Sequence, residues 1–386
     1  MNRCFCICSA NYLPNIGGIE KYTEALAHAL ANFGNHVIII TNNTFNLADH
    51  EFLSEQIEIY RLPCFPLING RLPIPKRNHV YKKLLQEIKE RPIDYISINA
   101  RFYPLTFECV KLAESLGIKP LVTDHGSAYL TLGNPILDKA VSKYEDFITS
   151  RLIKHDIDFY GVSQLSVTWL KHFGIDACGV LNNSIDAVEF RNSSNSIMWK
   201  NKLNLPKNSI LVVFTGRLIP EKGITALLNT AKALNNRKDI HFAIAGDGPL
   251  KNEILDSELD TVHLVGKLDQ SSIASLLASA DIFCLPTRSE GFSTSLLEAA
   301  ASETAAVITD VGGVAELIPN KEYGIVIPNT NTETIAEAIL KLADNDILRL
   351  NIAKKIKSHV EQNFSWESTA KKIEIACQLA QRRNDD

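Results

Sequence analysis

The chain has 386 residues, of which 45% are hydrophobic and 22% are charged. This composition excludes intrinsic disorder and collagen-like structure, and the length indicates two or three ordinary domains or two large α/β domains. The 40 lysines and arginines against 44 aspartates and glutamates give a net charge of −4. A negative net charge argues against nucleic-acid binding through the overall charge of the protein.

The chain begins with a short apolar stretch, residues 4–8, that predicts a first strand. Asn11 and Pro14 follow at once, so the stretch is too short for a signal peptide. No run approaches the roughly 18 apolar residues of a membrane span. Eight cysteines spread over so long a chain do not form a disulfide framework, and we predict a reduced, cytoplasmic protein.

Cys4, Cys6 and Cys8 alternate along this first strand and therefore share one face. Three thiols on one face could hold a soft metal, but no partner His or Cys pair follows at zinc spacing. Cysteine is also a small, well-buried hydrophobe, so the core is the favoured interpretation. We expect no metal site.

Short apolar runs rich in β-branched residues recur along the chain, each followed by a helix-like stretch. Runs that are apolar on both faces are typical of buried parallel strands. In the first half they cover residues 4–8, 36–41, 57–62, 93–98, 120–123 and 157–162, and in the second half 210–215, 241–246, 262–266, 281–285, 305–309 and 324–327. Two such series predict an α/β protein with two doubly wound, Rossmann-like domains.

The domain boundary is expected in the polar, turn-rich segment 182–201. We place the first domain at residues 1–185 and the second at 186–365. Ligands of doubly wound sheets lie outside the carboxyl ends of the strands. The loops at these ends should therefore carry any chemistry.

Two such loops of the first series hold candidate residues. Gly17 and Gly18 lie between the first strand and its helix, where they would let a backbone approach an anion, although for a glycine pair alone a tight turn is the favoured interpretation. His125 and Gly126 follow the strand at 120–123. A lone histidine is more often structural than functional, so both interpretations stay open.

Arg217 and Lys222 flank the turn after the strand at 210–215 and precede the next helix. Two cations at a helix N-terminus suit a diphosphate, which an arginine can bind with two parallel hydrogen bonds. The alternative is a pair of solvated surface charges. A tight loop, Gly246-Asp247-Gly248-Pro249, follows the next strand.

The longest loop follows the strand at 281–285 and leads to two glutamates. Glu290 precedes the next helix, and Glu298 lies about two turns later in an otherwise apolar helix start. Such carboxylates can bind sugar or ribose hydroxyls, and the amides from Gly291 to Ser295 can meet phosphate oxygens. The alternative is a helix cap at Glu290 and a salt bridge at Glu298.

Taken in order from Gly17 to about Trp366, these motifs closely resemble glycosyltransferase family 4. The resemblance implies a GT-B fold, in which two Rossmann-like domains face each other across a cleft, and a retaining glycosyltransferase that uses a nucleotide sugar. The spacing of Glu290 and Glu298 matches the paired-glutamate motif of that family. The end of the chain, about 366–386, resembles the helix that crosses back to the first domain.

The resemblance also implies roles for single residues. Cationic side chains would bind the donor diphosphate and stabilise the departing nucleotide, carboxylates would bind the ribose and the donor sugar, and the histidine would contact that sugar. The implied catalytic residues are His125, Glu290, Arg217 and Lys222. The implied donor-binding residues are Gly17, Gly18, Arg217, Lys222, Glu290, Gly291, Phe292, Ser293, Thr294, Ser295 and Glu298.

Members of the family usually need no divalent metal, so no cofactor is expected, and two cations take the place of the metal. The expected donor is a UDP-sugar first and GDP-mannose second, with a hexose or an N-acetylhexosamine transferred. The polar triplet at 293–295 replaces the more usual glycine and aliphatic residues, which could alter the donor preference.

The first domain is expected to hold the acceptor, a glycan or a polyprenyl-diphosphate-linked sugar in the synthesis of a surface polysaccharide or lipopolysaccharide. Between Arg71 and Arg91, seven cations stand against two glutamates, and Leu84, Leu85 and Ile88 follow at helical spacing. Such a segment suits peripheral contact with the anionic inner face of the plasma membrane. A solvated surface helix is the equal alternative.

Other function classes share the predicted fold. A glycan phosphorylase would need a lysine site for pyridoxal phosphate, and none is evident. A nucleotide-sugar epimerase of the same fold would release a free sugar without an acceptor. A non-catalytic nucleotide-sugar-binding scaffold is the third alternative, although it has no need for the combination of Arg217, Lys222, Glu290 and Glu298.

Overall fold

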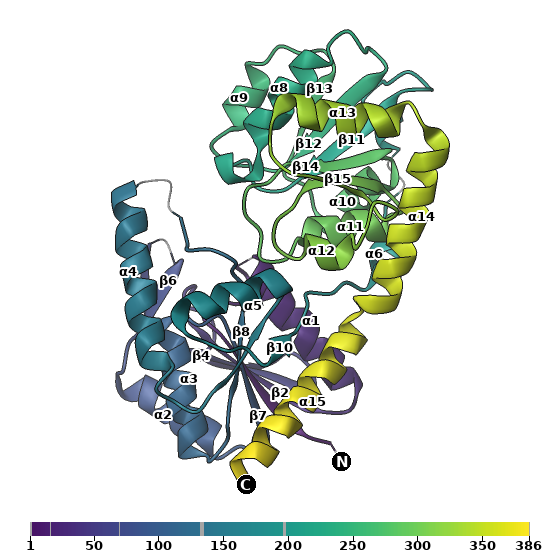
Figure 1. Ribbon diagram of the computed structural model, residues 1–386. Helices are drawn as coiled ribbons and strands as arrows, with labels where there is room; N and C mark the ends of the chain where they lie inside the picture. Colours follow the sequence, from purple (N-terminus) through teal and green to yellow (C-terminus); the bar gives the residue numbers. More distant parts are fainter. Residues whose placement is uncertain (1, 16, 69, 132–134, 196–197, 386) are drawn as a thin grey trace. The chain divides into compact units, whose positions relative to one another are not determined.

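The computed structural model describes residues 2–15, 17–68, 70–131, 135–195 and 198–385. The chain divides into two compact units, which Figure 1 shows. Unit 1 comprises Met1–Asn183 and Trp366–Asp386, and unit 2 comprises Ser184–Ser365. Each unit is described by itself.

Unit 1 is built on an eight-stranded sheet with the strand order β10-β9-β8-β7-β1-β2-β4-β3. The pairings are parallel, except that β3 lies antiparallel to β4 at one edge. The strands are β1 (Cys4–Ser9), β2 (His36–Asn42), β3 (His50–Phe52), β4 (Ile57–Leu62), β7 (Tyr95–Asn99), β8 (Leu121–Asp124), β9 (Asp158–Gly161) and β10 (Gly179–Val180). A separate antiparallel hairpin pairs β5 (Cys64–Leu67) with β6 (Leu72–Pro75).

Helices cover both faces of this sheet. The helical elements of unit 1 are α1 (Gly18–Asn32), α2 (His79–Lys89), α3 (Pro104–Ser115), α4 (Pro135–Leu152), α5 (Gln164–Leu170), η1 (Lys171–Phe173) and α15 (Trp366–Asp385). One core contains side chains of α2, α3, α5 and the end of α4, and the core on the other face contains side chains of α1 and α15. Figure 1 shows α15, at the yellow end of the chain, beside α1.

The first strand divides its side chains between these two cores. Cys4, Cys6 and Cys8 belong to the core beneath α2 and α3, while Phe5 and Ile7 belong to the core beneath α1 and α15. The three thiols therefore share one face, as the alternation predicts. They are buried among apolar side chains, in the position of ordinary core residues.

Unit 2 is built on a six-stranded parallel sheet with the order β13-β12-β11-β14-β15-β16. Its strands are β11 (Ile210–Thr215), β12 (Ile240–Ala245), β13 (Val262–Gly266), β14 (Ile282–Leu285), β15 (Ala305–Thr309) and β16 (Ile325–Ile327). Its helical elements are α6 (Ala187–Asn192), α7 (Trp199–Lys202), η2 (Pro220–Lys222), α8 (Ile224–Ala233), α9 (Lys251–Leu255), α10 (Gln270–Ala278), α11 (Thr294–Ala301), α12 (Val314–Leu317), α13 (Thr332–Ala343) and α14 (Asp346–Asn363).

The predicted fold class, α/β with two doubly wound sheets, is confirmed. Every apolar run that predicts a strand contains one, with ends shifted by two residues or fewer. The strands that the sequence did not indicate are β3, the hairpin strands β5 and β6, and the two-residue β10. These are short strands at an edge or outside the main sheet, so they lack the continuous apolar pattern of a buried strand.

In each unit the strand order reverses beside one strand. In unit 1, β1 pairs with both β2 and β7, and in unit 2, β11 pairs with both β12 and β14. Loops that leave two such neighbouring strands in opposite directions open a crevice at their carboxyl ends, which is where open α/β sheets bind ligands.

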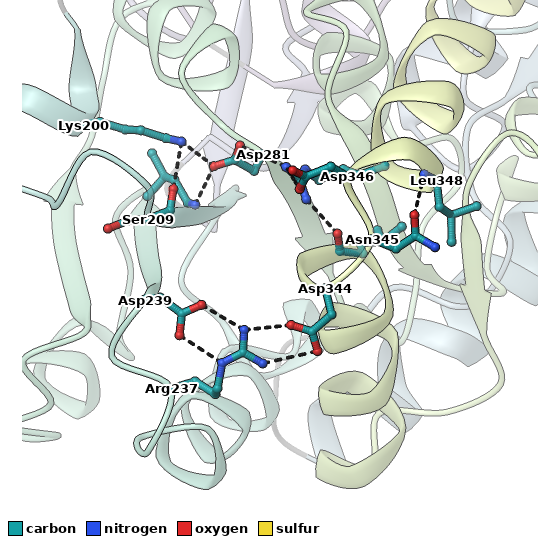
Figure 2. Close-up of polar contacts among 12 residues, drawn as sticks. Lys200, Ser209, Arg237, Asp239, Asp281, Asp344, Asn345, Asp346 and Leu348 are labelled. Atoms are coloured by element: carbon teal, nitrogen blue, oxygen red, sulfur yellow. Dashed lines mark hydrogen bonds and ion pairs between the residues drawn. The ribbon is translucent and has the colours of Figure 1, made fainter.

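Two clusters of polar contacts, together called the polar network, lie at the amino ends of the unit 2 strands (Figure 2). Asp281, just before β14, accepts hydrogen bonds from Leu211 N at 2.8 Å and from Lys200 Nζ at 2.6 Å. Arg237 lies between the carboxylates of Asp239 and Asp344 and donates to both at 2.8 Å. The network is thus on the side of the sheet away from the loops that carry the candidate residues.

Candidate functional site

In unit 2, Arg217 and Lys222 lie in the loop after β11. The turn η2 ends this loop, and α8 begins directly after Gly223. Gly223 has φ +76°, and a Cβ there would lie 1.9 Å from the carbonyl oxygen of Pro286. Only glycine therefore lets this loop pack against the loop that follows β14.

The two loops bring Lys222 and Glu290 together. Lys222 Nζ donates a hydrogen bond to Glu290 Oε1, and the side chains are 18% and 12% exposed. The carbonyl of Glu221 accepts from Thr287 Oγ1 at 3.0 Å and from Arg288 N at 2.7 Å, which ties the two loops together. A cation and a carboxylate from separate predicted motifs are thus neighbours where the strand order of unit 2 reverses.

Arg217 lies on the same loop as Lys222 but is exposed. Within the part of the chain that the structure describes, no ion pair engages its guanidinium. A guanidinium free to meet an anion, beside a lysine held by a carboxylate, is an arrangement that suits a doubly charged ligand.

Residues 291–295 form the entry to α11. The side chain of Ser293 caps the helix, since Ser293 Oγ accepts from Leu296 N at 3.2 Å. Thr294 and Ser295 open the first turn and are partly exposed. Amides in the first turn of a helix have no intrahelical acceptor and attract phosphate oxygens.

Phe292 contributes its ring to the core of unit 2. It is 6% exposed and lies 5.7 Å from the ring of Phe364, centroid to centroid. A Cβ on Gly313 would lie 2.1 Å from the Phe292 ring, and a Cβ on Gly312, where φ is +58°, would lie 2.6 Å from Glu290 O. The two glycines after β15 therefore allow that loop to pack against the backbone at Glu290 and Gly291.

Glu298 is on α11, partly exposed among buried neighbours. It lies one turn after Thr294, on the same face of the helix. The structure thus joins Lys222 with Glu290 through a direct ion pair, and it places Glu298 on the helix that follows Glu290.

In unit 1, His125 directly follows β8. Its Nε2 lies 3.0 Å from Asn99 Oδ1, and its ring meets that of Tyr22 edge-on, with centroids 4.8 Å apart. Burial lowers the pKa of His125 to about 3, so the imidazole is neutral at physiological pH. A neutral imidazole can donate at one nitrogen and accept at the other.

Gly17 and Gly18 lead into α1. Gly18 opens the helix, and a Cβ there would meet nothing within 4 Å. A Cβ on Gly17 would lie 2.3 Å from Glu20 Oε2, and Asn15 Nδ2 donates to the other oxygen of Glu20 at 2.8 Å. Burial raises the pKa of Glu20. The carboxyl group occupies the space beside Gly17, so Gly18 is the glycine that is open to a ligand.

A buried cluster fixes the loop that carries His125. Arg101, Asp124 and Glu145 are each 1% exposed, and Arg101 Nη2 donates to Glu145 Oε2 at 3.0 Å. Arg101 Nε lies 3.4 Å from Asp124 Oδ2, and Glu145 Oε1 accepts from Leu130 N at 2.9 Å. The loop is therefore held at both ends, at Asp124 and at Leu130, by one arginine–glutamate pair.

The predicted apolar stripe of the segment between Arg71 and Arg91 faces the protein interior. Leu84 and Ile88 are on the buried face of α2, and Leu85 packs against the same core. The stripe is therefore not available to a membrane, because the helix needs it to cover the sheet. Exposed apolar side chains lie instead on and beside the hairpin β5–β6, at Phe65, Leu67, Ile68 and Ile74.

Asn99, Thr23, Arg101 and Glu145 did not emerge from the sequence as site residues. Asn99 and Arg101 come at the carboxyl end of the predicted strand at 93–98, which neighbours the strand before His125. That shared sheet edge is a signal that could have indicated them. Thr23 and Glu145 lie on helices, where the sequence offers no comparable signal.

The described residues hold neither a metal-binding cluster nor a membrane-spanning helix. No group of three or more His, Cys, Asp or Glu side chains that could hold a metal occurs among them. None of the helices seen in this part of the chain combines the length and the apolar character that crossing a bilayer requires.

The sequence matches two family profiles, which together cover most of it. The profile described as Glycosyltransferase Family 4 matches residues 16–189, and the profile described as Glycosyl transferases group 1 matches residues 195–359.

Among curated proteins, the chain is 24% identical over 384 residues to the GPI3 subunit of phosphatidylinositol N-acetylglucosaminyltransferase from Saccharomyces cerevisiae, covering 97% of this chain and 83% of that protein. It is 27% identical over 322 residues to the putative teichuronic acid biosynthesis glycosyltransferase TuaC of Bacillus subtilis, covering 82% of this chain and 79% of that protein.

Among solved structures, the fold is similar to that of sucrose-phosphate synthase from Thermosynechococcus elongatus, with a TM-score of 0.74 at 19% identity over 98% of this chain and 99% of the other. It is also similar to Anabaena HepE in complex with UDP-glucose, with a TM-score of 0.74 at 16% identity over 97% and 99% of the two chains. At these identities the likeness shows the fold alone, the GT-B fold with its two α/β sheets.

Proposed function

This chain belongs to glycosyltransferase family 4, and from that premise we propose that it transfers a hexose or an N-acetylhexosamine from a UDP-sugar to a glycan or lipid-linked acceptor, with retention of anomeric configuration. The observation that carries the proposal is the pair formed by Lys222 and Glu290, with the exposed Arg217 on the same loop. These groups lie where the unit 2 sheet offers a ligand crevice.

In this proposal the cations hold the diphosphate of the donor. Arg217 and Lys222 donate to its oxygens, and the amides of Thr294 and Ser295 at the start of α11 contribute further donors. As the sugar departs, negative charge grows on the diphosphate, and these donors stabilise it in a fixed geometry. Metal independence is part of the proposal, since two cations are already present for this charge.

The carboxylates bind hydroxyl groups of the donor. Glu290 accepts hydrogen bonds from hydroxyls of the sugar, the amides of Gly291 and Phe292 donate to its oxygens, and Glu298 accepts from the ribose hydroxyls. His125, neutral at working pH, offers its remaining lone pair to a sugar hydroxyl. Gly18 offers an open backbone at the start of α1 to the phosphates or the acceptor.

We propose that the reaction proceeds on one face of the donor sugar. The bond between the anomeric carbon and the phosphate oxygen breaks while the acceptor oxygen bonds to the same face of that carbon. The acceptor proton passes to the phosphate oxygen of the leaving UDP. This sequence needs no protein nucleophile.

The choice of UDP over GDP rests on the similar proteins. HepE of Anabaena has been crystallised with UDP and with UDP-glucose, and several similar curated proteins are named as N-acetylglucosaminyltransferases. These names support a UDP-linked donor as the first choice and leave GDP-mannose as the second.

The acceptor side of the proposal draws on unit 1. A hollow of about 260 Å³ is lined by Asn11, Asn15, Thr44, Phe45, Pro66, Gly70 and Arg71. Amide and hydroxyl groups, an aromatic face and a cation suit a sugar attached to an anionic group. The exposed apolar side chains of the adjacent hairpin suit the lipid part of such an acceptor or the surface of an anionic membrane.

The experiment that tests the proposed function measures product and nucleotide release together. The full chain is incubated with UDP-glucose, UDP-galactose, their N-acetyl forms or GDP-mannose, with EDTA, and with a panel of lipid-linked and free glycans. We expect acceptor-dependent UDP release and an α-linked product from an α-linked donor, seen by NMR of the anomeric proton. Release of free sugar that needs no acceptor would favour the epimerase alternative, and an inverted product would refute retention.

A further inference from the structure

We propose that Asn99 is a positioning residue for His125: it fixes the imidazole in the tautomer with the proton on Nε2, so that Nδ1 is the nitrogen offered to the substrate. This inference rests on the proposed function, because it is there that His125 contacts the donor sugar. It adds a residue that neither the motifs nor the similar proteins indicate.

Asn99 lies at the point where the strand order of unit 1 reverses. It is the last residue of β7, paired with Ser9 of β1 on one side and with Thr123 of β8 on the other. The side chain is 1% exposed. Its Nδ2 donates to Thr23 Oγ1 at 2.9 Å, and its Oδ1 lies 3.0 Å from His125 Nε2.

Thr23 sets the donor and acceptor roles in the hydrogen bonds that run from Thr23 through Asn99 to His125. Thr23 Oγ1 donates its proton to the carbonyl of Ile19 at 2.9 Å, so the same oxygen can only accept from Asn99. The amide nitrogen of Asn99 must therefore face Thr23, and its carbonyl oxygen must face His125. A carbonyl oxygen only accepts, so His125 Nε2 must carry the proton.

The remaining nitrogen of His125 then has a lone pair. A neutral imidazole carries one proton, and burial keeps this ring neutral. Edge-on contact with Tyr22, itself 2% exposed, holds the ring plane. Nδ1 is thus a hydrogen-bond acceptor of fixed direction, which suits a hydroxyl group of a sugar. The other tautomer would present an N–H there and leave two acceptors facing each other at Asn99.

¹⁵N NMR of the free, full-length protein labelled at histidine measures the tautomer of His125 directly. The signal that disappears in His125→Gln is the signal of His125. We expect His125 Nε2 to resonate as a protonated nitrogen and Nδ1 as an unprotonated one at neutral pH. A protonated Nδ1, or averaged shifts from two tautomers, would overturn the inference without any mutation of Asn99.

The matching variant is Asn99→Ala. It removes the acceptor for Nε2–H, so we expect averaged tautomer signals and a fall in kcat of roughly tenfold to hundredfold, the size of effect known for partners that orient metal-bound histidines. The donor KM should change much less than kcat. Asn99→Asp keeps an oxygen opposite Nε2 and should restore the single tautomer.

The control is Asn35→Ala, which removes another asparagine of unit 1 that is 4% exposed and hydrogen-bonded to Leu30 O and Arg3 N. It should lower stability without moving the His125 signals. Should Asn99→Ala fail to fold, Thr23→Val removes the acceptor that orients the amide and should also mix the tautomers. Unchanged tautomer signals and kcat in both variants would refute the role of Asn99.

The two proposals fail in different ways. If the wild-type protein turns over none of the donors, the proposed function fails, while the NMR measurement on the free protein still decides the tautomer. If the wild type is active and loses activity in His125→Gln but not in Asn99→Ala, the proposed function stands and the inference about Asn99 falls.

Discussion

At the scale of single residues, the proposed diphosphate site depends on how Lys222 is held. Its partner Glu290 comes from a different loop, and both side chains are mostly buried, at 18% and 12% exposure. A lysine already paired with a carboxylate loses little side-chain entropy when it turns to a phosphate. In the proposed complex, Glu290 stays beside the donor sugar while Lys222 binds the diphosphate.

Lys222→Ala should therefore lower turnover by about a hundredfold or more, because it removes a donor that stabilises charge on the leaving diphosphate. The measurement is kcat for UDP release, with circular dichroism to check the fold. Lys232→Ala, an exposed lysine on α8, is the matched control and should retain wild-type turnover. Wild-type activity in Lys222→Ala would remove the diphosphate role.

Asp124 makes stability depend on pH. Burial raises the pKa of Asp124 to about 6, despite the nearby Arg101. A carboxyl group whose pKa is higher in the folded than in the unfolded chain stabilises the fold while it is protonated. That contribution is fully present below about pH 4 and is lost as pH rises through about 6. The shift corresponds to at most about 3 kcal/mol.

Asp124→Asn removes this titration. The free energy of unfolding of the variant, taken relative to that of the wild type, should be higher at pH 7.5 than at pH 4.5 by about 1–3 kcal/mol. Urea unfolding at the two pH values measures it, with the exposed Asp256→Asn as control. Parallel pH dependences for wild type and Asp124→Asn would contradict the assignment.

At the scale of elements, the sequence predicts best where burial is continuous. Strands such as β11 and β15 are apolar on both faces, and their predicted and observed bounds coincide. The loops after β11 and β14 could be predicted as site loops because parallel strands share one carboxyl edge. That Lys222 meets Glu290 could not be predicted, because it depends on the register of neighbouring strands and on Gly223.

The helix α2 illustrates the opposite case. Its periodicity predicts an apolar stripe, but periodicity does not tell whether a stripe covers a core or a membrane. Leu84 and Ile88 are in the core, so the membrane proposal now depends on exposed lysines and on the hairpin β5–β6. The sequence did not predict the hairpin, because prolines are unusual inside a sheet. In the hairpin, Pro66 is paired with Pro73.

The network around Asp281 predicts a stability effect separate from function. Asp281→Asn weakens hydrogen bonds to Lys200 and to the backbone of β11, so it should lower the free energy of unfolding by about 1–3 kcal/mol. Donor binding should be unchanged, because the network lies at the amino ends of the strands (Figure 2). Asp346→Asn, whose carboxylate is 74% exposed, should have little effect. An unchanged unfolding midpoint in Asp281→Asn would contradict this.

At the scale of the whole molecule, the chain returns to its first unit. Trp366–Asp386 belongs to unit 1, and α15 packs beside α1 through Ala370, Ile373 and Cys377 in the core. The resemblance implied this return, because no local pattern shows which sheet a terminal helix will cover. Each unit therefore completes its sheet and core with its own set of helices, and substrate binding can be assigned to a unit by mutation.

The proposed membrane contact belongs to this scale as well. The full protein should bind vesicles with anionic lipid better than neutral vesicles, in a salt-sensitive way, and neutralising Lys82 and Lys83 together should reduce that binding. Neutralising Lys371 and Lys372 on α15 is the control with equal charge change. Co-sedimentation measures both. Equal binding to neutral vesicles, or equal loss in both double variants, would refute a specific contact through α2.

Calorimetric titration of the full chain with UDP, GDP and ADP, each with EDTA, tests whether Arg217 and Lys222 hold the donor diphosphate. We expect one-to-one binding of UDP without metal, at least tenfold weaker in Lys222→Ala and unchanged in Lys232→Ala. If no nucleotide binds at millimolar concentration, or if binding requires a divalent metal, then Arg217 and Lys222 do not hold a donor diphosphate in the way proposed here.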